Sequence, residues 1–242
     1  MEDNKVRLLE YFYSIDGETK RSGELVWFIR VTQCNLACRW CDTNYCHWEQ
    51  GYDIDIDELV DKIEKTNSCK KVTLTGGEPL IHKNITKLIL RLLEDGFNLN
   101  IETNGSVNPY KILDKKIFGK YRKNGQLWFS LDYKCKYSGM QDKMISGRSA
   151  AYVLGNYDCY KFVVANEEDL NDAYHRIKLI ERYYRERKVP EVKRCTYYLS
   201  PCFGEIELPK IIDFMKEKNL IKRVKFQIQA HKVVWDFNQR GV

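Results

Sequence analysis

The stretch from residue 25 to residue 41, LVWFIRVTQCNLACRWC, decides how this 242-residue chain is interpreted. Its first part, residues 25–31, is a short apolar run rich in β-branched and aromatic side chains, which is typical of a buried strand. Cys34, Cys38 and Cys41 follow immediately. In open α/β sheets ligands bind beyond the carboxyl ends of the strands, so these cysteines are expected at a functional edge.

The rest of the chain alternates strand-like and helix-like patterns. We predict strands at 71–75, 98–102, 127–131, 160–164, 196–199 and 224–228, and helices at 55–65, 84–94, 167–185 and 209–218. Such alternation implies right-handed βαβ units and an α/β fold with a parallel sheet. The sequences GGEP (76–79) and ETNG (102–105) each follow a predicted strand. They should therefore meet the cysteines at one edge of one sheet.

The composition is that of a globular protein, with 43% hydrophobic and 31% charged residues. The sequence contains no run of about 18 apolar residues, so no membrane-spanning helix is predicted. The first residues, MEDNKVRLLEYFYS, lack the apolar centre of a signal peptide, so a cytoplasmic location is expected. We find no linker, repeat or low-complexity tract, and predict a single domain over residues 1–242.

The net charge of +6 is a modest excess. A solvated, lysine-rich surface accounts for such an excess without any polyanionic partner. We therefore expect no nucleic acid partner and no membrane partner.

Only three or four of the nine cysteines are clustered, and the three in 34–41 have the spacing C-x3-C-x2-C. Clustered thiols in a reducing compartment favour metal ligation over disulfides. Three thiolates can bind three irons of a cubane cluster and leave the fourth iron open for a cofactor. The alternative is a structural zinc site with Cys46 or His47 as fourth ligand. The sequence has no second C-x2-C pair, which such sites usually contain.

The segment RVTQCNLACRWCDT (30–43), followed by GGEP, resembles the radical S-adenosylmethionine (SAM) superfamily. This resemblance implies that Cys34, Cys38 and Cys41 bind a [4Fe–4S] cluster whose open iron is chelated by SAM. It implies a partial (β/α)6-type radical SAM barrel, with the cluster at the C-terminal edge of the strands. Reductive cleavage of SAM would give a 5′-deoxyadenosyl radical, while the protein orients the reactants.

Further segments resemble the 7-carboxy-7-deazaguanine synthase family. They are FYSIDGE (12–18), SLDYK (130–134) and the tail segments HKVVW (231–235) and RGV (240–242). The resemblance implies a radical SAM lyase. It would contract the ring of 6-carboxy-5,6,7,8-tetrahydropterin to 7-carboxy-7-deazaguanine with loss of ammonia, on the pathway to queuosine.

The same resemblance assigns site residues. Thr43 would bind Mg²⁺ through its hydroxyl, a hard oxygen ligand of the kind this ion prefers. SAM would be bound by Gly76, Gly77, Glu78, Gly105, Ser130, Asp132, Lys134 and Ser200. The substrate would be bound by Ile15, Asp16, Gly17, Glu18, Arg30, Thr103, His231 and Val242. Arg30 could hold the substrate carboxylate in bidentate fashion. The chain departs from the family pattern at Asp16, where Gln is common, and in SLDYK, where many relatives have Ser-Pro-Lys.

The family resemblance also implies a homodimer that receives electrons from a flavodoxin or ferredoxin. Two other functions remain open at this point. A glycyl-radical activating enzyme would share the cluster and GGEP, but the N-terminal loop and the tail resemble parts that bind a small molecule. A non-enzymatic zinc or iron–sulfur module would leave GGEP and ETNG without a role.

Overall fold

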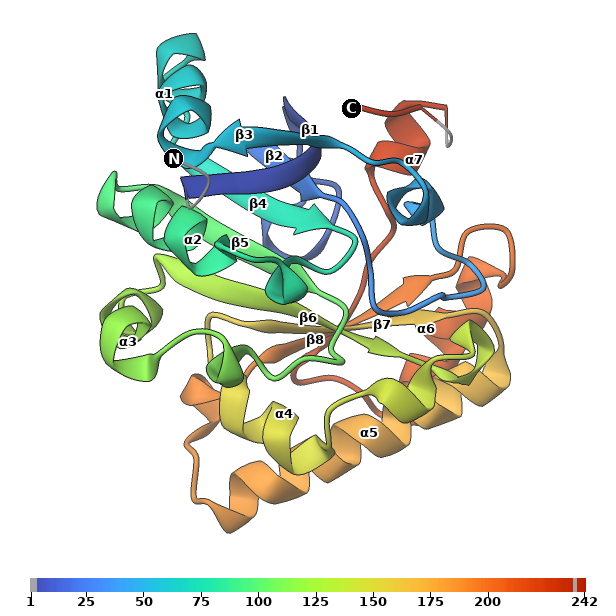
Figure 1. The fold of residues 1–242 in the computed structure, drawn as a ribbon. Helices are drawn as coiled ribbons and strands as arrows, with labels where there is room; N and C mark the ends of the chain where they lie inside the picture. The colour runs from blue at the N-terminus through green and yellow to red at the C-terminus, as the bar shows by residue number, and fades with distance from the viewer. Residues whose placement is uncertain (1–3, 237–238) are drawn as a thin grey trace.

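The computed structural model describes residues 4–236 and 239–242, and its centre is one nine-stranded sheet (Figure 1). In spatial order the strands are β3 (Tyr52–Asp55), β1 (Lys5–Ile15), β2 (Leu25–Val31), β4 (Lys71–Gly76), β5 (Asn98–Thr103), β6 (Leu127–Lys134), β7 (Cys159–Val164), β8 (Thr196–Pro201) and β9 (Val224–Phe226). Every pairing from β2 to β9 is parallel, whereas β1 runs antiparallel to β2 and β3. The sheet stays open, with β3 and β9 as its edges. The predicted α/β fold with a mostly parallel sheet is thus confirmed.

Helices cover one face of this sheet (Figure 1). They are α1 (Ile56–Thr66), α2 (Ile85–Glu94), α3 (Lys115–Lys123), α4 (Gly147–Val153), α5 (Glu167–Glu186) and α6 (Leu208–Glu217), and the short α7 (His231–Val234) lies near the C-terminus. Helices α1 to α3 pack on strands β1 to β6 in one apolar cluster, and α4 to α6 pack on β6 to β9 in a second. No helix in the described part of the chain is both long enough and apolar enough to cross a membrane.

Side-chain caps fix two of the predicted helix starts. The carboxylate of Asp55 accepts hydrogen bonds from the backbone N–H groups of Asp57 and Glu58 at the start of α1. Asn166 accepts one from Asp169 N at 2.9 Å at the start of α5. These caps satisfy N–H groups that have no partner inside the helix. The local sequence therefore determines where both helices begin.

The sequence patterns missed five of the strands and α-helices that the structure describes: β1, β3, α3, α4 and the four-residue α7. The register of β1 shifts between Leu8 and Glu10, which breaks its alternation of apolar and polar side chains. The helix α3 buries only Phe118 and Tyr121, and α4 has only seven residues. Weak or interrupted periodicity explains each omission.

The inner face of the sheet, opposite the helices, is polar. Val72 and Leu74 of β4 point into the apolar cluster, so Thr73 and Thr75 between them point the other way. The same alternation places Asn100 and Glu102 of β5, Ser130, Asp132 and Lys134 of β6, and Lys161 of β7 on the inner face. A polar lining in the middle of a parallel sheet is unusual, because both faces are normally apolar. It marks this face as the candidate site.

Candidate active site

Three loops at the carboxyl ends of β2, β4 and β5 interlock. Glu78 N donates to Gln33 O at 2.9 Å, and Gly77 N donates to Val31 O at 3.1 Å. From the third loop, Asn104 Nδ2 donates to Cys34 Sγ at 3.4 Å. The predicted meeting of the cysteine loop, GGEP and ETNG at one sheet edge is confirmed.

The two glycines of GGEP allow this close approach. A Cβ atom on Gly77 would lie 1.7 Å from Gln33 O, and one on Gly76 would lie 2.3 Å from Val31 O. Gly76 also has a φ of +133°, which L-residues rarely adopt. Gly77 is therefore required by contact with the cysteine loop, and Gly76 by contact with Val31 at the end of β2. Their predicted contact with SAM stays a prediction.

The buried side chain of Glu78 links the GGEP and ETNG loops by hydrogen bonds. Its Oε1 accepts hydrogen bonds from Thr103 Oγ1 at 2.7 Å and from Leu80 N at 3.0 Å, and its Oε2 accepts one from Asn104 N at 2.6 Å. The side chain is completely buried, and burial raises its pKa to about 6. The sequence suggested Glu78 and Thr103 as ligand contacts. In the structure, both use their side chains to join the loops.

The three cysteines of the motif are ligands of the type that an iron–sulfur cluster needs, while in the described part of the chain no three Cys, His, Asp or Glu side chains converge on a single metal-ion position. Cys34, Cys38 and Cys41 are partly exposed free thiols on one short loop. Cys34 Sγ accepts hydrogen bonds from Leu36 N at 3.4 Å and from Asn104, and such bonds tune cluster potentials. Burial raises the pKa of Cys41 to about 11, so a cation is needed to hold it as a thiolate.

Cys46 differs from these three. It is completely buried, and burial raises the pKa of its thiol to about 12. Its backbone closes the base of the loop, because Cys46 N donates to Thr43 O at 3.0 Å and Cys46 O accepts from Gln33 N at 2.8 Å. We therefore assign Cys46 to the protein core as a neutral thiol.

Several buried polar atoms have no hydrogen-bond partner among the described residues. Two of them are Trp40 Nε1, in the cysteine loop, and Ser200 Oγ, at the carboxyl end of β8. Buried polar groups in proteins are nearly always paired. These two atoms are consistent with a bound polar group at this edge of the sheet, as predicted for Ser200.

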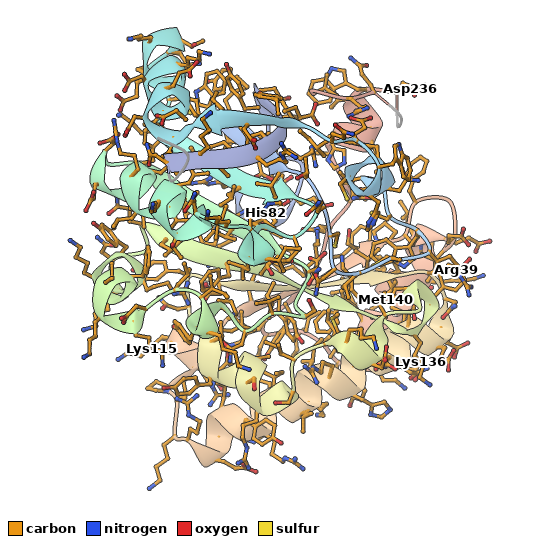
Figure 2. The ribbon with its side chains drawn as sticks, in the orientation of Figure 1. Arg39, His82, Lys115, Lys136, Met140 and Asp236 are labelled. Carbon is orange, nitrogen blue, oxygen red and sulfur yellow. The ribbon has the colours of Figure 1, made fainter. Side chains whose placement is uncertain are left out.

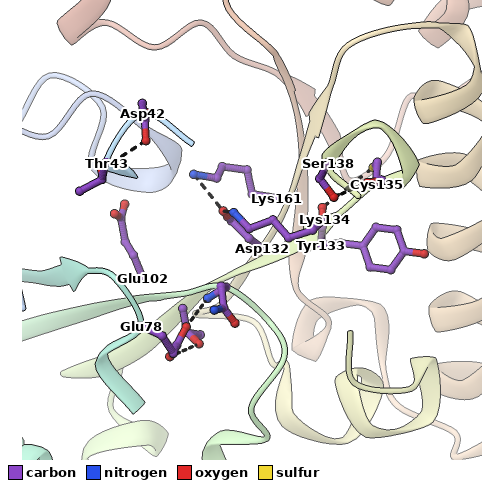
Figure 3. Close-up of polar contacts among 12 residues, drawn as sticks. Asp42, Thr43, Glu78, Glu102, Asp132, Tyr133, Lys134, Cys135, Ser138 and Lys161 are labelled. Carbon is purple, nitrogen blue, oxygen red and sulfur yellow. Dashed lines mark hydrogen bonds and ion pairs between the residues drawn. The ribbon is translucent and has the colours of Figure 1, made fainter. Parts of the chain in front are cut away.

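The predicted cofactor residues of β6 all lie on the inner face, but they differ in what covers them. Lys134 Nζ pairs with Asp132 Oδ2 at 2.6 Å (Figure 3). It also lies 4.9 Å from the centre of the Trp40 ring. Ser130 instead donates to Asn100 Oδ1 at 3.0 Å and contacts Thr19, and it is 1% exposed. Asp132 and Lys134 are thus available near the cysteine loop, whereas Ser130 is enclosed by protein. Gly105, with a φ of +78°, packs against the backbone of Asp132.

Arg30 and Thr43 lie together on the other side of the loop. Arg30 Nε donates to Glu10 Oε1 at 2.8 Å, and its NH1 lies 3.4 Å from Thr43 Oγ1. Thr43 makes no side-chain cap to the following 3-10 helix, Asn44–His47. Its hydroxyl accepts from Arg30 and donates to Asp42 Oδ1 at 3.3 Å (Figure 3), and the predicted binding roles of Arg30 and Thr43 stay predictions.

The N-terminal loop and the C-terminal tail meet above the inner face. Gly17 O accepts from Ala230 N at 3.0 Å, and a Cβ atom on Gly17 would lie 2.2 Å from His231 Nδ1. Glu18 Oε1 accepts from Gln229 Nε2 at 2.5 Å.

Ile15, the last residue of β1, begins this loop. Asp16 is 1% exposed and accepts from Thr73 Oγ1 at 2.8 Å and Glu18 N at 3.1 Å, so its carboxylate holds the loop in place. Val242 is half-buried, and its predicted substrate contact stays a prediction.

Sequence reasoning missed two ionisable residues of the inner face, Glu102 and Lys161, as site residues. Glu102 Oε2 accepts from Thr75 Oγ1 at 2.9 Å, and loss of solvation together with the nearby charges of Asp16 and Glu18 raises its pKa to about 8 (Figure 3). Lys161 pairs with Glu18 and Asp132. The available signal was a polar residue at alternate positions of an otherwise apolar strand.

Comparison with known proteins supports one family over the full length. Residues 28–135 match the model of the radical SAM superfamily. A curated 7-carboxy-7-deazaguanine synthase of Clostridium acetobutylicum is 36% identical over 238 residues, which cover 98% of this chain and 99% of that protein. The chain belongs to the 7-carboxy-7-deazaguanine synthase family of radical SAM enzymes. The synthase of Methanospirillum hungatei is 30% identical, over 95% of this chain and 85% of that protein.

The fold agrees with this assignment. The crystal structure of QueE from Escherichia coli superposes with a TM-score of 0.60 and 18% identity, over 94% of this chain and 95% of that one. As a radical SAM enzyme of this family, the protein uses a [4Fe–4S] cluster and SAM. The residues present fit these groups, because three accessible thiols, unpaired buried donors and a polar inner face share one edge of the sheet.

Proposed function

We propose that the protein is a 7-carboxy-7-deazaguanine synthase, which contracts the ring of 6-carboxy-5,6,7,8-tetrahydropterin with loss of ammonia. The observation that carries the proposal is the joining of the cysteine loop to the GGEP and ETNG loops beside a polar inner face, in a chain that matches the synthases over its whole length. When bound, the cluster and SAM supply the 5′-deoxyadenosyl radical that abstracts a hydrogen atom from the substrate.

The residues of the chain bind and orient the anionic substrate. Arg30 keeps nitrogen atoms beside Thr43 that can hold the pterin carboxylate, and Thr43 offers an oxygen ligand to Mg²⁺. Glu18 offers an acceptor for the amino edge of the heterocycle. Together they would place the reacting carbon toward the cysteine loop, and such positioning supplies a large part of enzymatic rate enhancement.

The tail helps to exclude water. Gln227 accepts from Thr19 N at 2.7 Å, and Lys232 Nζ lies 3.4 Å from Asp42 Oδ2 beside the cysteines. The tail therefore bridges the N-terminal loop and the cysteine loop. A closed site protects reactive intermediates from side reactions.

The test is anaerobic turnover of the reconstituted protein with SAM, a reductant and 6-carboxytetrahydropterin. A deazapurine product and 5′-deoxyadenosine are expected. Protein with a full cluster that forms no deazapurine would reject the proposal. SAM cleavage that occurs only after a partner protein is added would point instead to a glycyl-radical activating enzyme.

We further propose a single-domain, cytoplasmic homodimer that accepts electrons from a flavodoxin or ferredoxin. Reduced ligand thiols suit the cytoplasm. Arg39 is exposed in the cysteine loop, where its N donates to Ser138 O at 3.0 Å, and Lys136, which pairs with Glu168 at 2.8 Å, is exposed nearby (Figure 2). Positive side chains at this position suit an acidic electron carrier. Pull-down of flavodoxin at low and high salt tests this contact.

A further inference from the structure

Lys161 is a buried cation on the inner face that the family resemblance did not assign. It lies in the middle of β7, next to Asp132 in the sheet register, and is 8% exposed. Its Nζ pairs with Glu18 Oε2 and lies 3.3 Å from Asp132 Oδ1. A lysine is rarely buried without such partners, so the two contacts explain its position.

The two carboxylates that Lys161 joins belong to different parts of the site. Glu18 lies in the N-terminal loop, on the side proposed for the substrate, and is also held by Gln229 of the tail. Asp132 pairs with Lys134 (Figure 3). Lys134 in turn lies against Trp40 in the cysteine loop, on the side proposed for SAM. The chain of contacts therefore crosses from one ligand to the other through Lys161.

The two carboxylates, Glu18 and Asp132, balance the charges of the two ammonium groups, Lys134 and Lys161. Each charge shifts the pKa of its neighbours. Burial would lower the pKa of Lys161, but Asp132 and Glu18 raise it well above the usual value, so Lys161 remains protonated. Burial would raise the pKa of Asp132, but Lys134 and Lys161 lower it. Charges in a poorly solvated interior act strongly on their neighbours. A displacement of Glu18 by a ligand is therefore transmitted to Asp132 and Lys134.

We propose that Lys161 is a positioning residue that couples the substrate side of the site to the SAM side. Substrate seated against Glu18 fixes the Lys161 ammonium, which in turn fixes Asp132 and Lys134 for SAM. The inference rests on the proposed function, because it takes Glu18 as the substrate contact. By thermodynamic reciprocity, each ligand then tightens binding of the other by the same factor.

The experiment measures the affinity of the reconstituted, unreduced holoenzyme for SAM, with and without 6-carboxytetrahydropterin. In the wild-type protein the pterin is expected to tighten SAM binding, within the roughly 5- to 150-fold range of such couplings. In Lys161→Met this ratio should fall close to one, and Lys161→Arg should restore most of it. Under reducing conditions Lys161→Met should also release more 5′-deoxyadenosine per deazapurine formed.

Arg194→Met is the matched control. Arg194 forms a comparably buried ion pair with Glu181 at 2.6 Å, and Glu181 lies on α5, on the helix side of the sheet. Its loss should lower stability but leave the coupling ratio unchanged. If Lys161→Met does not fold, the double variant Glu18→Gln/Lys161→Met leaves neither charge unpaired, and its coupling ratio should be lower than that of Glu18→Gln alone, which keeps Lys161.

The outcomes separate the two proposals. A folded Lys161→Met or double variant with the wild-type ratio would overturn the positioning role. The positioning role would also be overturned if wild-type protein turns over normally but binds SAM with the same affinity with and without the pterin. Wild-type protein that forms no deazapurine would instead reject the proposed function.

Discussion

Gly77→Ala should disrupt the cysteine loop through a single methyl group. The new Cβ would lie 1.7 Å from Gln33 O, and contacts below 3.0 Å are essentially never observed, so one of the two backbones must move by at least about 1.3 Å. Gln33 directly precedes Cys34, so the ligand loop moves with it. Overpacking of this kind costs about 1–3 kcal/mol. Misplacement by about 1 Å at a reacting centre can lower the rate about 100-fold.

The assay measures iron and sulfide per chain after anaerobic reconstitution, the visible absorbance of the cluster, and turnover. Gly119→Ala is the control, because Gly119 lies within α3 and a Cβ there meets no atom within 4 Å. That variant should keep its cluster and gain about 0.5–1 kcal/mol of stability from helix propensity. Gly77→Ala with wild-type iron content and turnover would refute the argument that the glycine is required by contact with the loop.

Three more predictions concern single side chains. Cys46→Ala should leave the iron content unchanged, because its thiol is buried and neutral; a loss of iron on metal analysis would contradict this assignment. The folded-state pKa of Glu102 is raised to about 8 from 4.5, so its contribution to stability is full below pH 4.5 and is lost as the pH rises through 8. Relative to wild type, Glu102→Gln should therefore resist urea better at about pH 9 than at about pH 5, and an equal effect at both would refute the shift. Arg30→Lys should raise the KM for the pterin about 10- to 100-fold, because lysine cannot make a bidentate contact; an unchanged KM in steady-state assays would exclude that contact.

The sequence predicted the fold well wherever one segment carries its own signal. The strand from residue 25 to 31 and the capped helices α1 and α5 need no distant contact to be identified. Strand β1 was missed because the bulge between Leu8 and Glu10 shifts the phase of its pattern, and its pairing is antiparallel in an otherwise parallel series. Helix α3 was missed because Gly119 interrupts a mostly basic segment.

The site could be predicted only where a motif is compact. The three cysteines lie within eight positions, and their spacing, together with the surrounding residues and GGEP, indicated the chemistry. Lys161 and Glu18 are 143 positions apart, and neither lies in a pattern that points to the other. The inner face nevertheless left a local trace: Thr73, Asn100 and Lys161 each interrupt an apolar strand at the position that alternation assigns to one face. Burial of these polar groups costs free energy unless each has a hydrogen-bond partner. Polar residues on the inner face of several neighbouring parallel strands therefore predict that these strands line a common polar site. Applied to the strand pattern alone, that rule identifies Lys161 as a site residue, and the coupling experiment therefore tests the rule as well as this protein.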